Sequence, residues 1–183
     1  KTEIVLRAAF KAVENNKQVA IIAPTTLLVD QHYQTFKKRF INFPYKIGIL
    51  SRMQPKKNQK ITIEKLKEDK INIIIGTHRL LQKDIEFSNL GLLVIDEEQR
   101  FGVTHKEKIK YKHPLVDFLS ISATPIPRTL YMALSGARDL SLIKTPPTNR
   151  KPVLTYVAPY KNDIVCPAVD EELERNGQIF YLY

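Results

Sequence analysis

Residues 91–97, Gly-Leu-Leu-Val-Ile-Asp-Glu, contain the stretch that decides the fold class. A short continuous apolar run is typical of a strand that is buried on both faces of a parallel sheet. Further strand-sized runs occur at residues 18–23, 45–50, 71–75 and 116–121, and helical segments separate them. This order predicts an α/β fold, a doubly wound parallel sheet covered by helices on both faces.

The helical segments are recognised from apolar spacing and from capping residues. Ile4, Ala8 and Ala12 recur at a spacing of four residues, which is typical of an amphipathic helix. Thr25 and Thr26 are good caps for a following helix. Helices are predicted at residues 3–15, 27–40, 59–69, 78–82, 128–134 and 161–175, with a polar loop at 51–58.

A proline-rich segment at residues 145–152 is predicted to separate two domains, 1–148 and 149–183. Strand character is also predicted at residues 140–143, 153–157 and 178–183. The chain starts Lys1-Thr2-Glu3 without an initiator methionine, and it ends on an apolar strand-like run. We therefore expect it to be a piece of a longer protein.

The charge balance points to a polyanionic partner. Twenty-nine Lys and Arg residues against 19 Asp and Glu give a net charge of +10, and the isoelectric point is near 9.6. Nucleic acid is one such partner, whereas the alternative is lysine spread over solvated faces. No apolar run approaches the ~18–20 residues of a membrane-spanning helix, so no membrane partner is expected. The single Cys166 excludes an internal disulfide and fits a reducing, cytoplasmic location.

The pair Asp96 and Glu97 directly follows a predicted strand. Ligands bind at the carboxyl ends of strands in doubly wound sheets. The first carboxylate there can hold Mg²⁺, usually through water, and the second can polarise an attacking water molecule. The alternative is a solvated acidic turn.

Lys1-Thr2 matches the last two positions of the phosphate-binding loop G-x-x-x-x-G-K-S/T, in which lysine contacts phosphates and the hydroxyl holds Mg²⁺.

Other strand ends carry small hydroxyl residues and basic residues. Thr25 and Thr26 follow one strand, and Gly76, Thr77 and Arg79 follow another, which predicts contacts to a nucleic-acid backbone. Residues 56–60 form a basic segment, which is either a solvated loop or a DNA contact. Residues 122–124, Ser-Ala-Thr, can hydrogen-bond the metal-site carboxylates or an adjacent domain, although an ordinary turn has the same composition.

The ordered motifs resemble those of superfamily 2 helicases and translocases. They are KT (1–2), APTTLL (23–28), IGTHRLL (75–81), DEEQRFGV (96–103) and SATPIPRT (122–129), which are similar to motifs I, Ia, Ib, II and III. The residues after motifs II and III narrow the resemblance to bacterial transcription-repair coupling factors and RecG-type branched-DNA helicases. The stretch MALSGARDLS (132–141) and the DEEQ form of motif II are closer to the coupling factors.

The resemblance implies a RecA-like domain, the start of a second one, and an ATP-dependent double-stranded-DNA translocase. Such a motor displaces stalled RNA polymerase, recruits excision-repair protein and is nucleoid-associated in bacteria. It implies that Lys1 binds ATP phosphates, that Thr2 and Asp96 hold Mg²⁺, and that Glu97 activates water. Gln99 would sense the nucleotide or the partner domain, and Ser122, Ala123 and Thr124 would couple hydrolysis to movement.

Two alternatives remain open, a RecG-type helicase and a non-catalytic nucleic-acid-binding module. The glycines of motif I and nearly all of a second motor domain are absent from the sequence. We therefore expect the 183-residue chain alone to show little or no ATPase activity.

Overall fold

The computed structural model describes residues 1–97, 115–123, 139–145 and 153–182. The chain divides into two compact units, Lys1–Leu142 and Ile143–Tyr183. The predicted domain boundary at residues 148–149 lies within 146–152, outside the described residues, and it stays a prediction.

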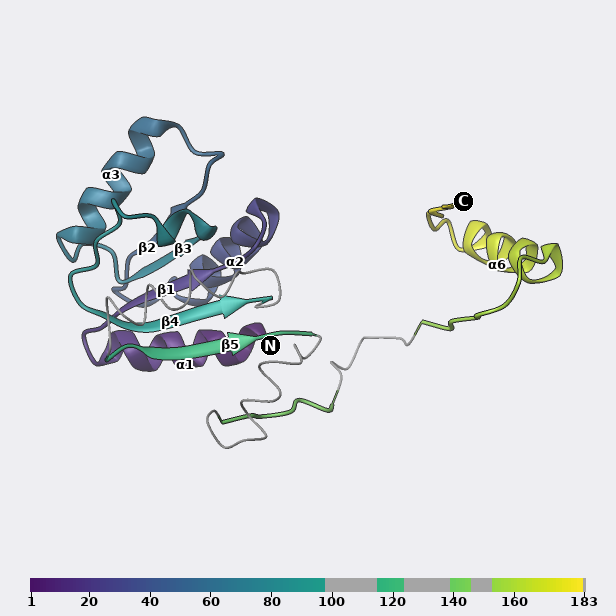
Figure 1. Cartoon of the computed structure of the whole chain (residues 1–183), viewed down its shortest axis with the longest axis horizontal. Coiled ribbons are helices and arrows are strands. Elements are labelled where there is room, and N and C mark those ends of the chain that lie inside the picture. The colour runs from purple at the N-terminus through teal and green to yellow at the C-terminus, as the bar shows by residue number, and fades with distance from the viewer. Residues whose placement is uncertain (98–114, 124–138, 146–152, 183) are drawn as a thin grey trace. The chain divides into compact units, whose positions relative to one another are not determined.

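The first unit contains a five-stranded sheet in the order β2-β3-β1-β4-β5 (Figure 1). All four neighbouring pairs are parallel, with Ile21 of β1 opposite both Ile75 of β3 and Val94 of β4. The strands are β1 (Gln18–Ile22), β2 (Ile47–Leu50), β3 (Ile73–Gly76), β4 (Leu90–Asp96) and β5 (Asp117–Ile121). The predicted doubly wound α/β fold is confirmed.

Helices cover both faces of this sheet, and successive residues of β1 alternate between two apolar clusters. Val19 and Ile21 lie in a cluster with side chains of α1 (Thr2–Glu14) and α2 (Thr26–Arg39). Ala20 and Ile22 lie in the other cluster, with side chains of α3 (Lys56–Lys67) and the 3₁₀ helix η1 (His78–Leu81). The alternation follows from the two-residue period of a strand. Because both faces of the sheet are covered, every residue of β1 is buried.

Helix α3 begins at Lys56, three residues earlier than predicted. Pro55 is its N-cap, with φ −53° and ψ 140°, and the Pro55 carbonyl accepts a hydrogen bond from the Gln59 N–H at 3.1 Å. Proline fits a helix start because the amide hydrogen that it lacks has no partner within the helix there. The predicted loop at 51–58 is therefore too long.

The second unit contains helix α6 (Asn162–Glu174), as predicted, with Cys166 exposed on it. The strands predicted at residues 140–143, 153–157 and 178–183 are wrong as far as the structure describes these segments, because residues 140–143, 153–157 and 178–182 form no strand and Tyr183 lies outside the described residues. An isolated extended segment gains no ladder hydrogen bonds, and the described residues offer these segments no paired neighbour. The helix predicted at 128–134 lies outside the described residues.

Candidate active site

The carboxyl ends of the strands are joined to one another by backbone hydrogen bonds. The Ala23 N–H after β1 donates to the Gly76 carbonyl at 3.0 Å, and the Thr77 N–H donates to the Leu50 carbonyl at 3.3 Å. The Glu97 N–H after β4 donates to the Ile121 carbonyl of β5 at 2.9 Å. Together with the pairing of Ile22 of β1 with Ile95 of β4, these bonds make one continuous edge of the sheet, and most of the predicted site residues lie on it.

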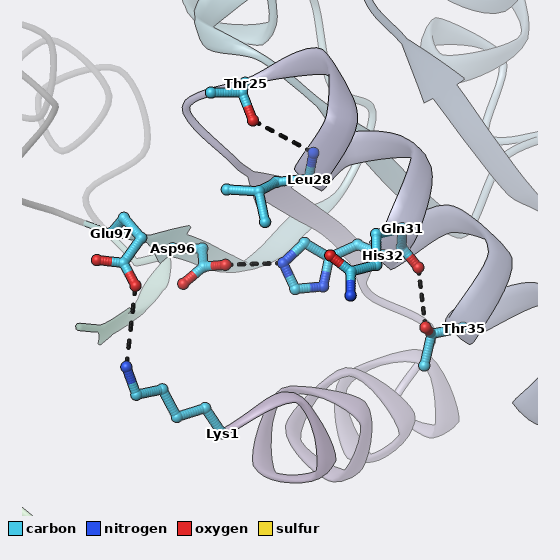
Figure 2. A network of polar contacts seen from close by, with 8 residues as sticks. All are labelled: Lys1, Thr25, Leu28, Gln31, His32, Thr35, Asp96 and Glu97. Carbon is cyan, nitrogen blue, oxygen red and sulfur yellow. Dashed lines mark hydrogen bonds and ion pairs between the residues drawn. The ribbon is translucent and has the colours of Figure 1, made fainter. Parts of the chain in front are cut away.

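Asp96 is the last residue of β4, and its side chain is held by a histidine of helix α2 (Figure 2). His32 Nε2 lies 2.8 Å from Asp96 Oδ2, and the two residues are only 7% and 8% exposed. A carboxylate only accepts hydrogen bonds, so Nε2 carries the hydrogen and donates it. One oxygen of Asp96 is thereby oriented, and the other remains for a further ligand.

Glu97 departs from the strand geometry. Leu92 and Val94 lie in the cluster on the face of α1 and α2, whereas Leu93 and Ile95 lie in the opposite cluster. Continued alternation would direct Glu97 to the face of α3. Instead its φ is 51°, in the left-handed region, and its carboxylate contacts Lys1 at the start of α1.

Lys1 and Thr2 lie at the start of helix α1. Lys1 Nζ is 3.8 Å from Glu97 Oε1, so the structure brings the predicted phosphate-binding lysine and the predicted water-activating carboxylate together. Lys1 is also the N-cap of α1 without a side-chain capping bond, and Thr2 is the first helical residue. The N–H groups and the dipole of a helix N-terminus favour anions such as phosphate.

The donor set fits Mg²⁺ that is shared with a nucleotide. Among the described residues, no group of three or more His, Cys, Asp or Glu side chains is placed to hold a metal ion. Mg²⁺ commonly needs only one or two protein carboxylates, together with substrate phosphates and water. Asp96 is one such carboxylate, with one oxygen not bound by His32, and the Thr2 hydroxyl is a further oxygen donor at the start of α1.

The two loops predicted to contact nucleic acid start helices. Thr25 Oγ1 accepts a hydrogen bond from the Leu28 N–H at 3.3 Å and caps α2, whose first residue Thr26 is half-buried. Thr77 is only 4% exposed, and its Oγ1 accepts from the Arg79 N–H at 3.4 Å. A β-carbon on the buried Gly76 would lie 2.4 Å from the Leu50 carbonyl oxygen, so the close strand pairing needs glycine here.

Arg79 makes two hydrogen bonds to Asp84. Its Nη1 and Nη2 atoms lie 2.8 Å and 2.6 Å from the two carboxylate oxygens. The hydrogen bond from the guanidinium is the main cause that lowers the pKa of the Asp84 carboxyl. The predicted DNA contact of Arg79 therefore involves a guanidinium that already has a partner.

A basic groove lies beside this pair, with a volume of 470 Å³. Arg52 comes from the loop after β2, Lys56 and Lys60 come from α3, and Arg79 comes from η1. The lysines of the predicted basic segment thus lie on a helix instead of a loop, with Lys56 and Lys60 on the same groove. Four cations and one carboxylate, Asp84, line it, which favours an anionic ligand.

The remaining predicted residues are only partly described. Ser122 and Ala123 follow β5 directly, next to the backbone bond between Ile121 and Glu97, whereas Gln99 and Thr124 lie outside the described residues. Their coupling roles stay predictions.

Sequence reasoning missed His32, although its spacing from Val29 and Phe36 places it on the buried face of α2. No helix in the described part of the chain is long and apolar enough to cross a membrane.

Comparisons with known proteins agree on one family. The profile of the DEAD/DEAH box helicase family matches residues 1–133. The transcription-repair-coupling factors of Bacillus subtilis (strain 168) and Escherichia coli (strain K12) are 56% and 54% identical over all 183 residues. The chain spans only 16% of the length of each of these relatives.

Solved structures have the same fold. A structure of RecG bound to a three-way DNA junction matches with a TM-score of 0.76 and 34% identity, over 98% of this chain and 24% of that one. The DUF1998 helicase MrfA bound to DNA matches with a TM-score of 0.57 over 74% of this chain and 20% of that one. Its identity of 14% shows the fold alone.

Proposed function

Because the chain belongs to the DEAD/DEAH box helicase family, we propose that it forms the first RecA-like domain of an ATP-dependent double-stranded-DNA translocase. The observation that carries the proposal is the placement of Lys1 beside Glu97, next to the buried Asp96, at the carboxyl edge of the sheet. A non-catalytic binding module has no need of two carboxylates held in this way, so the enzyme is favoured over that alternative.

In this proposal ATP and Mg²⁺ occupy the edge between α1 and β4. Mg²⁺ supplies charge neutralisation on the phosphates when it is bound. Lys1 and the first turn of α1 bind the phosphates, and Thr2 and Asp96 hold the cation. Glu97 accepts a hydrogen bond from the attacking water and orients it. The contact to Glu97 keeps the Lys1 ammonium at the site before the nucleotide binds.

Double-stranded DNA is the proposed polyanionic partner. Thr25 and Thr26 at the start of α2 contact its phosphates, and the loop of Gly76, Thr77 and Arg79 provides a second contact. The basic groove along α3 supports this, because its cations lie after β2 and β3 at the same edge of the sheet. Contacts of this kind bind the backbone and carry little sequence specificity.

We assign the motor to transcription-coupled repair, in which it displaces stalled RNA polymerase and recruits excision-repair protein in the bacterial cytoplasm, at the nucleoid. The similarity to transcription-repair-coupling factors over the whole chain supports this assignment. A RecG-type branched-DNA helicase is the second candidate, favoured by the similarity to RecG. In both, residues 149–183 begin a second RecA-like domain, and Gln99, Ser122, Ala123 and Thr124 couple the two domains.

The test is ATP hydrolysis by the full-length protein on plain linear duplex and on four-way-junction DNA. Strong stimulation by plain duplex is expected for the translocase, whereas stimulation chiefly by junctions supports the RecG-type helicase. Replacing Glu97 with glutamine should reduce DNA-stimulated turnover by orders of magnitude, because the amide no longer orients water as the carboxylate does. Glu68→Gln, at an exposed position after α3, is the control and should leave turnover unchanged.

Undiminished turnover in the Glu97→Gln protein contradicts the proposed role of this carboxylate. The 183-residue chain alone should hydrolyse ATP no faster than its Asp96→Ala variant. Faster hydrolysis would mean that the first domain suffices for catalysis.

A further inference from the structure

We propose that His32 is a positioning residue for Asp96, which it holds in the orientation that a nucleotide-bound cation requires. The inference rests on the proposed function, because it concerns the carboxylate assigned to Mg²⁺. It adds a residue outside the predicted site, contributed by a helix that starts at a predicted DNA-contacting loop.

The surroundings of His32 are those of a core position. Val29 and Phe36, one turn away on either side along α2, are both 0% exposed, and His32 itself is 7% exposed. A polar side chain in such a place costs free energy unless it is hydrogen-bonded. Asp96 satisfies it at 2.8 Å, so the imidazole and the carboxylate satisfy each other.

The bond is not needed to attach α2 to the sheet. Val29 and Phe36 pack in the cluster that includes Val19 and Ile21, and Thr25 caps the start of the helix. What the bond does determine is the rotation of the Asp96 side chain. With Oδ2 fixed on Nε2, the carboxylate plane is fixed as well, and the second oxygen points in a defined direction. Hydrogen-bond partners of metal-binding carboxylates act in this way.

Three variants of the full-length protein separate positioning from packing. His32→Leu removes the donor and keeps the position apolar and filled. His32→Gln keeps an N–H donor at the same number of bonds from Cβ as Nε2. Phe36→Leu is the matched control, because it alters the same buried face of α2 one turn further on and changes no polar contact with Asp96.

The first measurement is Mn²⁺ binding in the presence of ADP, followed by electron paramagnetic resonance. The second is ATP turnover on duplex DNA, analysed as kcat and KM. His32→Leu should weaken Mn²⁺ binding by about 10- to 100-fold and lower kcat by a similar factor with little change in KM. His32→Gln should recover most of both, and Phe36→Leu should bind Mn²⁺ like the wild type.

Wild-type Mn²⁺ affinity and kcat in a folded His32→Leu protein would overturn the inference. Equal losses in Phe36→Leu would also overturn it, because they would assign the effect to packing of α2. If His32→Leu does not fold, His32→Gln is compared with the wild type and with His32→Asn. Asparagine is too short to place its N–H at the Nε2 position, so Mn²⁺ binding should be retained in His32→Gln and weakened in His32→Asn, and equal binding by these two variants would overturn the inference. A wild-type protein without DNA-stimulated ATP turnover overturns the proposed function instead.

Discussion

Replacing Gln18 with leucine is expected to loosen the sheet at the end opposite the candidate active site. Gln18 starts β1, and only 1% of its surface is exposed. Its Nε2 donates to the carbonyls of Leu66 and Ile71, at 2.8 Å and 3.0 Å, and its Oε1 accepts from the Asn89 N–H at 3.1 Å. One side chain thus joins the end of α3 and the residues that lead into β3 and β4.

The magnitude follows from the groups that lose a partner. The Leu66 carbonyl keeps the bond from the Asp69 N–H at 3.3 Å, whereas Ile71 and Asn89 each lose the bond to Gln18. A buried polar group without its partner costs about 1–3 kcal/mol. Burial of the leucine side chain offsets part of this loss, by roughly 1–2 kcal/mol. With about 2 kcal/mol for the buried Ile71 carbonyl, about 1.5 kcal/mol for the half-buried Asn89 N–H and about 1.5 kcal/mol for the offset, the expected net loss of stability is about 2 kcal/mol, or roughly a 30-fold change in the opening equilibrium.

Hydrogen exchange of the full-length protein, measured by mass spectrometry, tests this locally. Peptides covering β1 and β3 should lose protection by that factor in Gln18→Leu. Gln34→Leu makes the same chemical change at an exposed position of α2 and should alter protection by less than about 0.5 kcal/mol. Unchanged protection in Gln18→Leu, or an equal loss in Gln34→Leu, would refute the reasoning that these three bonds are needed.

Two further predictions concern charged residues near the groove. The hydrogen bond from Arg79 lowers the pKa of the Asp84 carboxyl in the folded protein. The ionised carboxylate therefore stabilises the fold fully above the pKa of the unfolded chain, about 3.9, and this stabilisation is lost as the pH falls through the lower pKa of the folded protein. Asp84→Asn should therefore lower the melting temperature slightly at pH 7 and by progressively less as the pH falls below about 3.9, and a difference that does not shrink on acidification would contradict it. Replacing Lys60 with glutamine should reduce the slope of log K against log salt for duplex binding by about 0.9, if Lys60 neutralises one phosphate, and an unchanged slope would exclude that contact.

The first unit was largely predictable because its signals are local. The apolar run before Asp96 lies in strand β4, and the residues that recur every four positions from Ile4 lie in helix α1. The carboxyl edge was predictable as well, since parallel strands all end there. The end of a strand does not by itself place Lys1, because α1 must also start at the same edge. The contact between Lys1 and Glu97 shows that it does.

Other features depend on contacts that no local pattern contains. The strand order is set by pairing between segments far apart in the chain, and the segments at 140–143 and 153–157 have strand composition without a paired neighbour. His32 was missed for a similar reason. Its helical spacing indicated a buried position, but its partner Asp96 lies 64 residues away.

The backbone conformation of Glu97 explains how two adjacent carboxylates serve one site. In a regular strand, neighbouring side chains point to opposite faces, so Asp96 and Glu97 would be separated by the sheet. The left-handed φ of 51° at Glu97 breaks this alternation, and both carboxylates contact residues of the helices on one face, His32 and Lys1. Such a conformation costs a residue with a side chain of order 1–3 kcal/mol, so the surrounding structure must hold it. The hydrogen bond from the Glu97 N–H to the Ile121 carbonyl helps to do this, which makes β5 part of the support of the site.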